Sequence, residues 1–130
     1  MKLELVHNSD KYWEFIRTLR SNDEVQQGFG EQVHITREQQ EIYMKRHNDE
    51  YFVCLYNDEP AGFIGVVDGD IRVAVVPAFQ RRGVGLFMVH ELMKQTPDCQ
   101  AKVKIDNEAS LKLFVKAGFR KKFFLLEKAR

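Results

Sequence analysis

The alternation of polar and apolar residues near the start of the chain predicts a β-strand followed by a helix. Between Lys2 and His7 polar and apolar residues alternate, with Leu3 and Leu5 on the apolar side, which is the period of a half-buried strand. The candidate caps of the following helix are Asn8, Ser9 and Asp10. Its apolar stripe comprises Trp13, Ile16 and Leu19, with Phe15 beside it. The pattern therefore begins with β-α.

A second helix is predicted over residues 37–47. Thr36 and Gln39 have the spacing of a capping box, in which each side chain binds the backbone N–H of the other residue. Ile42 and Tyr43 are the residues of this helix that we expect in the core. The stretch between the two helices, residues 25–33, contains two glycines and follows no period.

Three consecutive strands are predicted over residues 51–56, 61–67 and 71–76. The first is rich in aromatic and β-branched residues, and turn residues separate it from the second at 57–60. Asp68 and Gly69 form a second hairpin signal. Because the turns are short, we expect the three strands to be antiparallel neighbours.

After Pro77 the apolar residues recur at helical spacing as far as Met93, and Pro97 closes this helix. Residues 101–105 and 123–126 read as further strands. The helix between them has Asp106 or Asn107 as its cap, and Gly118 fits the position just past its end. The predicted order is β-α-α-β-β-β-α-β-α-β, in one domain that spans residues 1–130.

Composition narrows the class of protein. Hydrophobic residues make up 44% of the chain, and 20 basic residues nearly balance 19 acidic ones, so net charge gives no reason to expect a nucleic-acid or membrane partner. No apolar run approaches the ~20 residues that span a bilayer, and residues 1–4 do not resemble a signal peptide. Cys54 and Cys99 lack metal-ligand spacing. We expect buried thiols, no metal and a cytoplasmic location.

A phosphate-binding turn is the strongest chemical signal in the sequence. Gly83 and Gly85 precede or open a helix, whose first N–H groups have no partner within the helix and lie at the positive end of its dipole. Two glycines let a pyrophosphate approach those groups closely, and Arg81 and Arg82 add positive charge. No Gly-Lys-Ser/Thr follows, and the three-glycine dinucleotide pattern is missing, which argues against an NTPase and a Rossmann domain.

The same residues belong to a longer pattern. Residues 74–85 read AVVPAFQRRGVG, which resembles the acetyl-CoA signature of the GNAT superfamily of N-acetyltransferases, Gln/Arg-x-x-Gly-x-Gly/Ala after a strand that ends in proline. A second family block is similar at residues 107–111 and 116–119. The resemblance implies an α/β fold with a mostly antiparallel, mixed sheet, splayed between its fourth and fifth strands. It covers nearly the whole chain.

The resemblance also implies a site and a mechanism. The fourth and fifth strands would form a V-shaped cleft for acetyl-CoA, the cosubstrate, and the N–H of Val75 or Val76 would stabilise the oxyanion. A primary amine would attack directly, so neither cysteine is needed as a nucleophile. The implied cofactor-binding residues are Val73, Val75, Val76, Gln80, Arg81, Arg82, Gly83, Val84, Gly85 and Asn107. Asn107 is equally explained as a helix cap.

The chain departs from the family at the general acid. Phe114 stands where many members have a tyrosine that protonates the leaving thiolate. Asp70 is a candidate general base, although Asp-Gly-Asp is also ordinary turn chemistry. Arg20, Glu31 and His34 are candidates for the acceptor side. Only eleven residues follow Phe119, so the acceptor side is expected to be open or completed by another subunit.

Several functions remain open at this point. Residues 19–23 and 32–39 are similar to bacterial members that acetylate nucleotide-linked amino sugars, so an amino sugar or other small molecule is the favoured acceptor. A peptide or protein amine is an alternative. Without its acid, the domain would instead be a non-catalytic acetyl-CoA-binding or sensing module. A plain nucleotide-binding domain would bind ATP as well as CoA. The protein is expected to be a monomer or homodimer.

Overall fold

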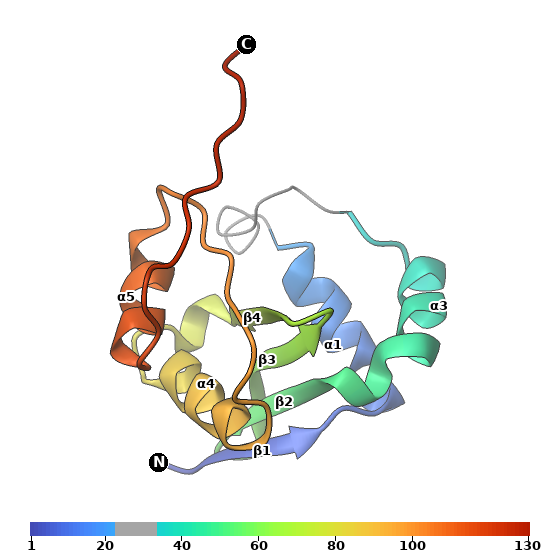
Figure 1. The fold of residues 1–130 in the computed structure, drawn as a ribbon. Helices are drawn as coiled ribbons and strands as arrows, with labels where there is room; N and C mark the ends of the chain where they lie inside the picture. Colours follow the sequence, from blue (N-terminus) through green and yellow to red (C-terminus); the bar gives the residue numbers. More distant parts are fainter. Residues whose placement is uncertain (23–33) are drawn as a thin grey trace.

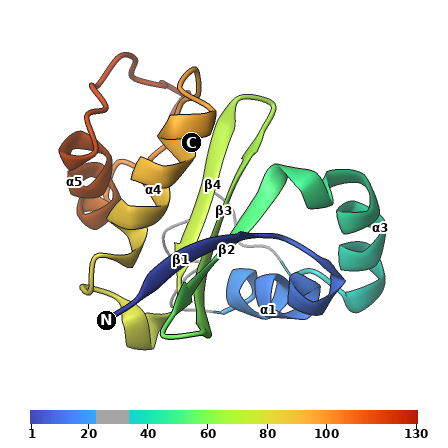
Figure 2. The same cartoon turned by 90° about the horizontal axis from the view of Figure 1, so that it is seen from below.

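A four-stranded antiparallel sheet with helices on both faces forms the molecule. Its strands are β1 (Leu3–His7), β2 (Tyr51–Tyr56), β3 (Glu59–Val67) and β4 (Asp70–Val75), in this order across the sheet. The computed structural model describes residues 1–22 and 34–130. In Figure 1 and Figure 2, α1 (Asp10–Arg20) and α3 (Arg37–His47) lie on one face, and α4 (Val84–Gln95) and α5 (Glu108–Lys116) on the other. Short 3-10 helices, η1 (Asn48–Glu50) and η2 (Pro77–Phe79), precede β2 and follow β4. The single α/β domain expected from the sequence is confirmed.

Both predicted hairpins are confirmed. Asn57 and Asp58 join β2 to β3 with φ angles of 48° and 70°, and Asp68 and Gly69 join β3 to β4 with φ angles of 54° and 81°. Two consecutive left-handed residues form the turn type whose twist matches that of the flanking strands. Asn, Asp and Gly tolerate this conformation best. The three strands are therefore antiparallel neighbours, as predicted.

The capping box before α3 is also confirmed. The Thr36 hydroxyl accepts from the Gln39 N–H at 3.1 Å, and the Gln39 side chain accepts from the Thr36 N–H at 2.9 Å. The interpretation of Ile42 as a core residue is wrong, because 73% of it is exposed. The helix instead buries Gln40 and Met44, four residues apart on its inner face.

Contact with α1 explains this rotation of α3. The Gln40 amide donates to the Trp13 carbonyl at 2.8 Å, so a polar side chain is accommodated between the two helices. Met44 is fully buried and joins Ile16 and Leu19 of α1 in one core cluster. A buried amide is stabilised only where such a partner exists.

The sheet separates two hydrophobic clusters. The first lies between the sheet and α1 and α3, and includes Tyr51, Val53, Phe63 and Ala74. The second lies under α4 and α5, and includes Cys54, Ile64, Met88, Leu92 and Phe114. Along β4, Ala74 belongs to the first cluster, whereas Ile71, Val73 and Val75 pack against the second. Successive β4 side chains thus point to opposite faces, as in any strand.

Residues 101–105, expected to form a strand, do not form one. The chain pairs with β4 only at Gln100, in a single parallel bridge to Asp70, and then leaves β4. The side chains of Ala101 and Val103 still pack against the second cluster, which accounts for the alternating pattern. Ile105 is 96% exposed. A strand needs a continuous ladder of backbone hydrogen bonds, and here that ladder stops after one residue.

Residues 123–126 do not form the predicted final strand either. Their four apolar side chains are all more than 80% exposed. Figure 1 shows this part of the chain leading away from the sheet. No strand of the described residues lies beside it, so its backbone has no ladder partner.

Among residues 1–22 and 34–130, no helix has the length and apolar character that a bilayer crossing requires.

Candidate functional site

The free edge of β4 is the first feature of the site. The Ile71 N–H donates across this edge to the Gln100 carbonyl at 2.8 Å. In an antiparallel strand, backbone groups point alternately to the two neighbours. The N–H and C=O groups of Val73 and Val75 therefore point to the same edge as those of Ile71. Beyond Gln100, the described residues place no strand against them.

Val76 differs from Val75 in this respect. Its N–H donates to the Ala61 carbonyl of β3 at 2.8 Å, on the opposite side of the strand. The Val75 carbonyl accepts only a long bond of 3.4 Å from the Gln80 amide. Of the two N–H groups considered for an oxyanion, that of Val75 is the one directed to the open edge.

The glycine turn lies at the end of this edge. Gly83 is the N-cap of α4, with φ 80° and ψ 5°, a left-handed conformation that favours glycine. The first helical bond runs from the Phe87 N–H to the Gly83 carbonyl at 3.0 Å. The N–H groups of residues 84–86 thus have no partner within the helix. A Cβ built on Gly83 would have no described heavy atom within 4 Å, so the described residues leave open space around this position.

Gly85 has a second reason to be glycine, which the sequence analysis missed. A Cβ at this position would lie 3.2 Å from Leu113 Cδ2 and 3.7 Å from Val75 Cγ2. The first distance is tight, so Gly85 also permits close packing of α4 on α5. No local sequence signal identifies this contact, because Leu113 is distant in the chain.

The two arginines of the turn are held differently. Arg81 has φ 63°, so its backbone is left-handed as well. The Arg82 guanidinium lies over the rings of Tyr56 and Phe79, 5.6 and 5.8 Å from their centroids. Such cation–π contacts hold a guanidinium while leaving its N–H groups accessible. Arg82 is therefore held beside the glycine turn at residues 83–85 by residues of β2 and η2.

Comparison with known proteins decides the family. The model of the acetyltransferase (GNAT) family matches residues 13–119. The chain belongs to the GNAT family. No curated protein sequence matches it.

Solved structures of GNAT and related proteins share the fold at low sequence identity. A spermidine N-acetyltransferase from Vibrio cholerae, in complex with CoA and spermine, superposes with a TM-score of 0.84 at 15% identity, over 97% of this chain and 85% of that one. A GNAT acetyltransferase from Streptococcus pneumoniae gives 0.73 at 17%, over 94% and 87%. An aminoglycoside acetyltransferase in complex with coenzyme A gives 0.73 at 17%, over 93% and 86%.

Phe114 of this GNAT domain lies in the core. It is 5% exposed, and its ring meets that of Phe119 edge-on, with centroids 5.1 Å apart. It belongs to the cluster that contains Val84 and Met88 of α4. The position where the resemblance predicts a general acid thus lies against α4, and its side chain is apolar.

Asn107 is the N-cap of α5, and its side chain accepts from the Ser110 N–H at 3.1 Å. The structural role given to it from the sequence is confirmed. Whether it also contacts the cofactor remains a prediction.

Asp70 lies where residue 100 meets β4. One carboxylate oxygen accepts from the Gln100 amide at 2.9 Å, and the other is 3.1 Å from Lys102 Nζ. These two hydrogen bonds, and then the charges of Lys102 and Arg72, lower the pKa of Asp70. The carboxylate is therefore ionised at neutral pH. Its role as a general base stays a prediction.

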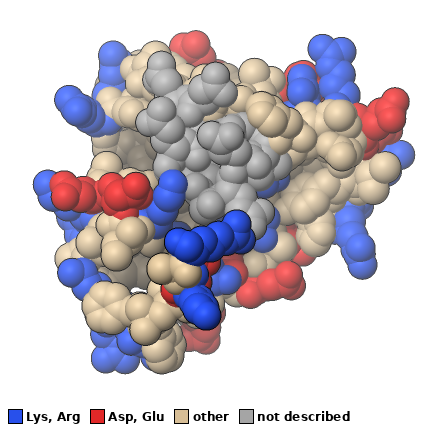
Figure 3. All heavy atoms as spheres, turned by 90° about the horizontal axis from the view of Figure 1, so that it is seen from above, with Lys and Arg blue, Asp and Glu red and all other residues tan. Residues whose placement is uncertain are grey.

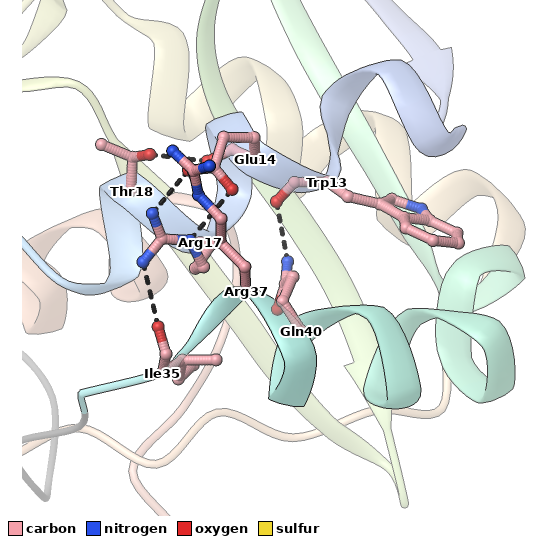
Figure 4. Close-up of polar contacts among 7 residues, drawn as sticks. All are labelled: Trp13, Glu14, Arg17, Thr18, Ile35, Arg37 and Gln40. Carbon is pink, nitrogen blue, oxygen red and sulfur yellow. Dashed lines mark hydrogen bonds and ion pairs between the residues drawn. The ribbon is translucent and has the colours of Figure 1, made fainter.

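The candidate acceptor residues are only partly described. Glu31 lies outside the described residues, and His34 is exposed. Arg20 is partly buried at the end of α1. Close to it, Arg17 binds both Glu14 and the Ile35 carbonyl, which fastens the start of α3 to α1 (Figure 4).

Glu14 is shared by two arginines. Arg37 Nε of α3 lies 3.4 Å from the same carboxylate, so charged side chains of α1 and α3 meet at Glu14 (Figure 4). The hydrogen bond from Arg17 is the main cause that lowers the pKa of Glu14. This carboxylate is thus already occupied by two cations.

The cysteines and possible metal ligands add no further site. Cys54 is buried, and burial raises the pKa of its thiol to about 11, while Cys99 is partly buried and also unbridged. Within residues 1–22 and 34–130, no three His, Cys, Asp or Glu side chains are grouped as metal ligands.

Proposed function

We propose that this GNAT domain transfers an acetyl group from acetyl-CoA to a primary amine. One observation carries the proposal: the open edge of β4, with the backbone groups of Val73 and Val75, runs directly to the glycine cradle at the start of α4. The pantetheine arm of CoA contains two amides that bind such an edge as an added strand would. Its pyrophosphate matches free N–H groups at a positive helix end.

The proposal assigns separate residues to the binding of acetyl-CoA and to the acetyl-transfer step. In this proposal the cradle at residues 83–85 binds the pyrophosphate, with Arg81 and Arg82 beside it, and Val73 binds the arm. The amine nitrogen attacks the thioester carbonyl, forming the C–N bond. The Val75 N–H donates to the oxygen that becomes negatively charged. Collapse breaks the C–S bond, the thiolate leaves, and the nitrogen loses a proton to a base such as Asp70 or to water.

The acceptor is proposed to be a small-molecule amine. Two similar structures contain a spermidine N-acetyltransferase with spermine and an aminoglycoside acetyltransferase with kanamycin. An amino sugar remains our more specific prediction. The identities of 15–17% leave the acceptor to experiment.

Binding without turnover is the second candidate function, and Phe114 is the observation that favours it. Its buried ring offers no proton to a leaving thiolate. A CoA thiolate is a fairly good leaving group, however, and water is an alternative donor. We therefore favour the enzyme.

Two measurements on one protein sample test the proposal. Acetyl-CoA should raise the melting temperature, because it binds the folded state, and ATP should raise it much less. Free thiol should then appear when amines are added, beyond slow hydrolysis of acetyl-CoA alone. Stabilisation without thiol release, over a broad amine panel, would support the non-catalytic alternative. Equal stabilisation by ATP would contradict the cradle as a CoA site.

A further inference from the structure

We infer that residues 121–127 form a β-strand on residues 101–104 of a second copy of this chain, and that two copies exchange these segments reciprocally. The exchange would complete the wall of the predicted acetyl-CoA cleft that faces β4. The interface itself does not depend on the proposed function, whereas its effect on acetyl-CoA binding rests on that function.

The segment that would be exchanged exposes a large apolar surface. Phe123, Phe124, Leu125 and Leu126 are all more than 80% exposed. Side chains of this size bury about 150–200 Å² each, so the four come to roughly 600–800 Å² per copy. A contiguous apolar patch of more than a few hundred Å² marks an interaction site on a soluble protein. Two copies would together bury about 1,200–1,600 Å², the size of a stable interface.

The receiving segment has an extended backbone without a ladder. Gln100 makes two backbone hydrogen bonds toward the start of β4, of 2.9 Å through its N–H and 2.8 Å through its carbonyl. In an extended chain the following residues direct their backbone groups alternately to the two edges. The N–H and C=O groups of Ala101 and Val103 therefore point away from β4. Among residues 1–22 and 34–130, no strand or bridge pairs with residues 101–104.

The inner face of this receiving segment is already in place. The side chains of Ala101 and Val103 pack against the second hydrophobic cluster, and Ile105 just beyond them is exposed. An unpaired backbone edge beside core residues is a template for an added strand. Because side chains of a strand alternate between its faces, two of the four apolar residues 123–126 would extend the cluster under α4 and α5.

Charges at the ends of the two segments favour an antiparallel arrangement. That arrangement brings Glu127 beside Lys102 and carries Lys121 and Lys122 past the receiving segment toward Asp106. A parallel arrangement would instead place Lys121 and Lys122 beside Lys102. Opposite charges across neighbouring strands are stabilising, and like charges directly opposite each other are destabilising.

The direction of the chain excludes that arrangement within one copy. In Figure 1, residues 101–105 (orange) and residues 120–130 (dark red) both lead toward the same end of the molecule. To run antiparallel, the segment would have to reverse over residues 120–122, Arg-Lys-Lys, none of which favours a turn. A second copy supplies the opposite direction without a turn. Reciprocal exchange between two copies also closes the assembly, so no exposed strand edge remains for further copies.

An anionic membrane is the other partner that an apolar segment flanked by lysines suggests. The segment leads toward the end of the molecule that Figure 3 shows from above. On that face, Lys and Arg side chains are interspersed with Asp and Glu side chains among the residues coloured by charge (Figure 3). A mixed surface gives no single field toward anionic lipids. The second copy is therefore favoured.

The added strand would also stabilise the cleft. In the proposed function, acetyl-CoA lies between β4 and residues 101–104, and a single copy pairs this wall with β4 only at Gln100. A strand on the outer edge of the wall would restrict its motion and leave the inner edge open for the cosubstrate. Binding of acetyl-CoA would then lose less conformational freedom.

The oligomeric state of the full chain is the first test. Size-exclusion chromatography with light scattering, without acetyl-CoA, should give twice the chain mass of 15.3 kDa. Leu125→Lys should raise the dissociation constant of the dimer about tenfold or more, because it removes one buried leucine from each exchanged segment. Ile42→Lys is the matched control, since Ile42 is an exposed apolar residue of α3 on the other face of the sheet. A monomeric wild type, or a dimer that Leu125→Lys leaves unchanged, would overturn the inference.

Disulfide cross-linking tests whether the segments pair between chains. A chain with Lys104→Cys is mixed with a longer, tagged chain that carries Phe124→Cys or Leu125→Cys. A disulfide-linked species of mixed mass is expected on a non-reducing gel, and Lys45→Cys in place of Lys104→Cys should give none. If a single chain with Lys104→Cys and Leu125→Cys loses both new thiols and stays monomeric, the pairing lies within one chain and the inference is wrong.

Binding measurements separate this inference from the proposed function. Leu125→Lys should weaken acetyl-CoA binding by calorimetry about two- to tenfold, the effect of one more group to be ordered, and Ile42→Lys should not. Equal affinity in dimer and monomer would overturn the role of the second copy in the cleft. If the wild type binds no acetyl-CoA, the proposed function fails, while chromatography and cross-linking still decide the exchange. A monomer that sediments with vesicles of phosphatidylcholine and phosphatidylserine would overturn the exchange in favour of a membrane.

Discussion

Replacing Gly83 by alanine tests the cradle at residues 83–85. The structure allows the effect of this substitution on folding stability to be separated from its effect on acetyl-CoA affinity. The residue has φ 80°, and a Cβ there would contact no described atom within 4 Å. The folded domain therefore loses stability only through backbone strain, about 1–2 kcal/mol for a left-handed alanine. In the proposed site, the same Cβ would crowd a pyrophosphate bound at the start of α4. We expect a moderate loss of stability and a larger loss of affinity for acetyl-CoA.

The loss of stability translates into a melting temperature. Unfolding entropy is about 2.1 cal/mol/K per residue, or roughly 270 cal/mol/K for a chain of 130 residues. The strain should then lower the melting temperature by about 4–7 °C. At a concentration of 100 times Kd, acetyl-CoA stabilises the wild type by about 2.7 kcal/mol, or roughly 10 °C. A tenfold weaker affinity removes about 1.4 kcal/mol, half of this increase.

Gly118→Ala is the matched control. Gly118 has φ 99°, and a Cβ there would also have no described neighbour within 4 Å. It follows α5, away from the start of α4, so it carries the same kind of strain without touching the cradle. Differential scanning fluorimetry with and without acetyl-CoA, followed by calorimetry, compares the two variants. Equal increases in melting temperature with acetyl-CoA in both would refute the cradle assignment.

Three further changes test other parts of the site and fold. If Asp70 is the base, Asp70→Asn should lower turnover at neutral pH by about 10²–10⁴-fold, with a smaller loss at high pH. The affinity for acetyl-CoA should stay nearly unchanged. Identical pH–rate profiles of wild type and variant would remove Asp70 from the mechanism. The pKa of Asp70 is lowered in the folded protein, so the ionised carboxylate stabilises the fold. This contribution should be complete above the ordinary pKa of about 3.9 and should disappear as the pH falls through the lowered value. Acid unfolding of the wild type and of Asp70→Asn measures the contribution. Phe114→Tyr should retain or raise turnover, because it restores a proton donor where many relatives have one. A lower melting temperature together with a large loss of turnover would contradict this. The new hydroxyl would then be buried without a partner, at a loss of about 1–3 kcal/mol of stability. Thr36→Ala should cost about 1 kcal/mol in urea unfolding without changing acetyl-CoA binding, since it removes only the cap of α3; an unchanged midpoint would contradict that role.

Features that a few adjacent residues determine could be predicted from the sequence. Asn57-Asp58 and Asp68-Gly69 are left-handed because their own side chains, or the lack of one, favour that conformation. The capping box of Thr36 and Gln39 is equally local. The cradle at Gly83 belongs to this class, since a turn and a helix start are all that it requires.

Features that depend on a distant partner could not be predicted. Ile42 is exposed because α3 turns Gln40 toward the Trp13 carbonyl of α1, and no periodicity within α3 reveals this bond. Residues 101–105 have the alternation of a strand, and two of their side chains do pack on the core. A ladder also needs a neighbouring backbone, and β4 supplies one only at Gln100. An alternating side-chain pattern and a backbone partner are both needed for a strand, and residues 101–105 have only the first.

The contact between β4 and Gln100 also connects the shape of the predicted cleft to the proposed chemistry of Asp70. Asp70 joins residue 100 through the bridge and residue 102 through an ion pair, so it helps to fix the point from which the chain diverges from β4. Its carboxylate consequently stays charged where an acceptor ammonium would lose its proton. A carboxylate with a lowered pKa is a weaker base, but in the proposed reaction its permanent charge would still attract an ammonium and align it with the thioester. In the proposed reaction, the closing contact and the selection of an amine would then depend on this one residue.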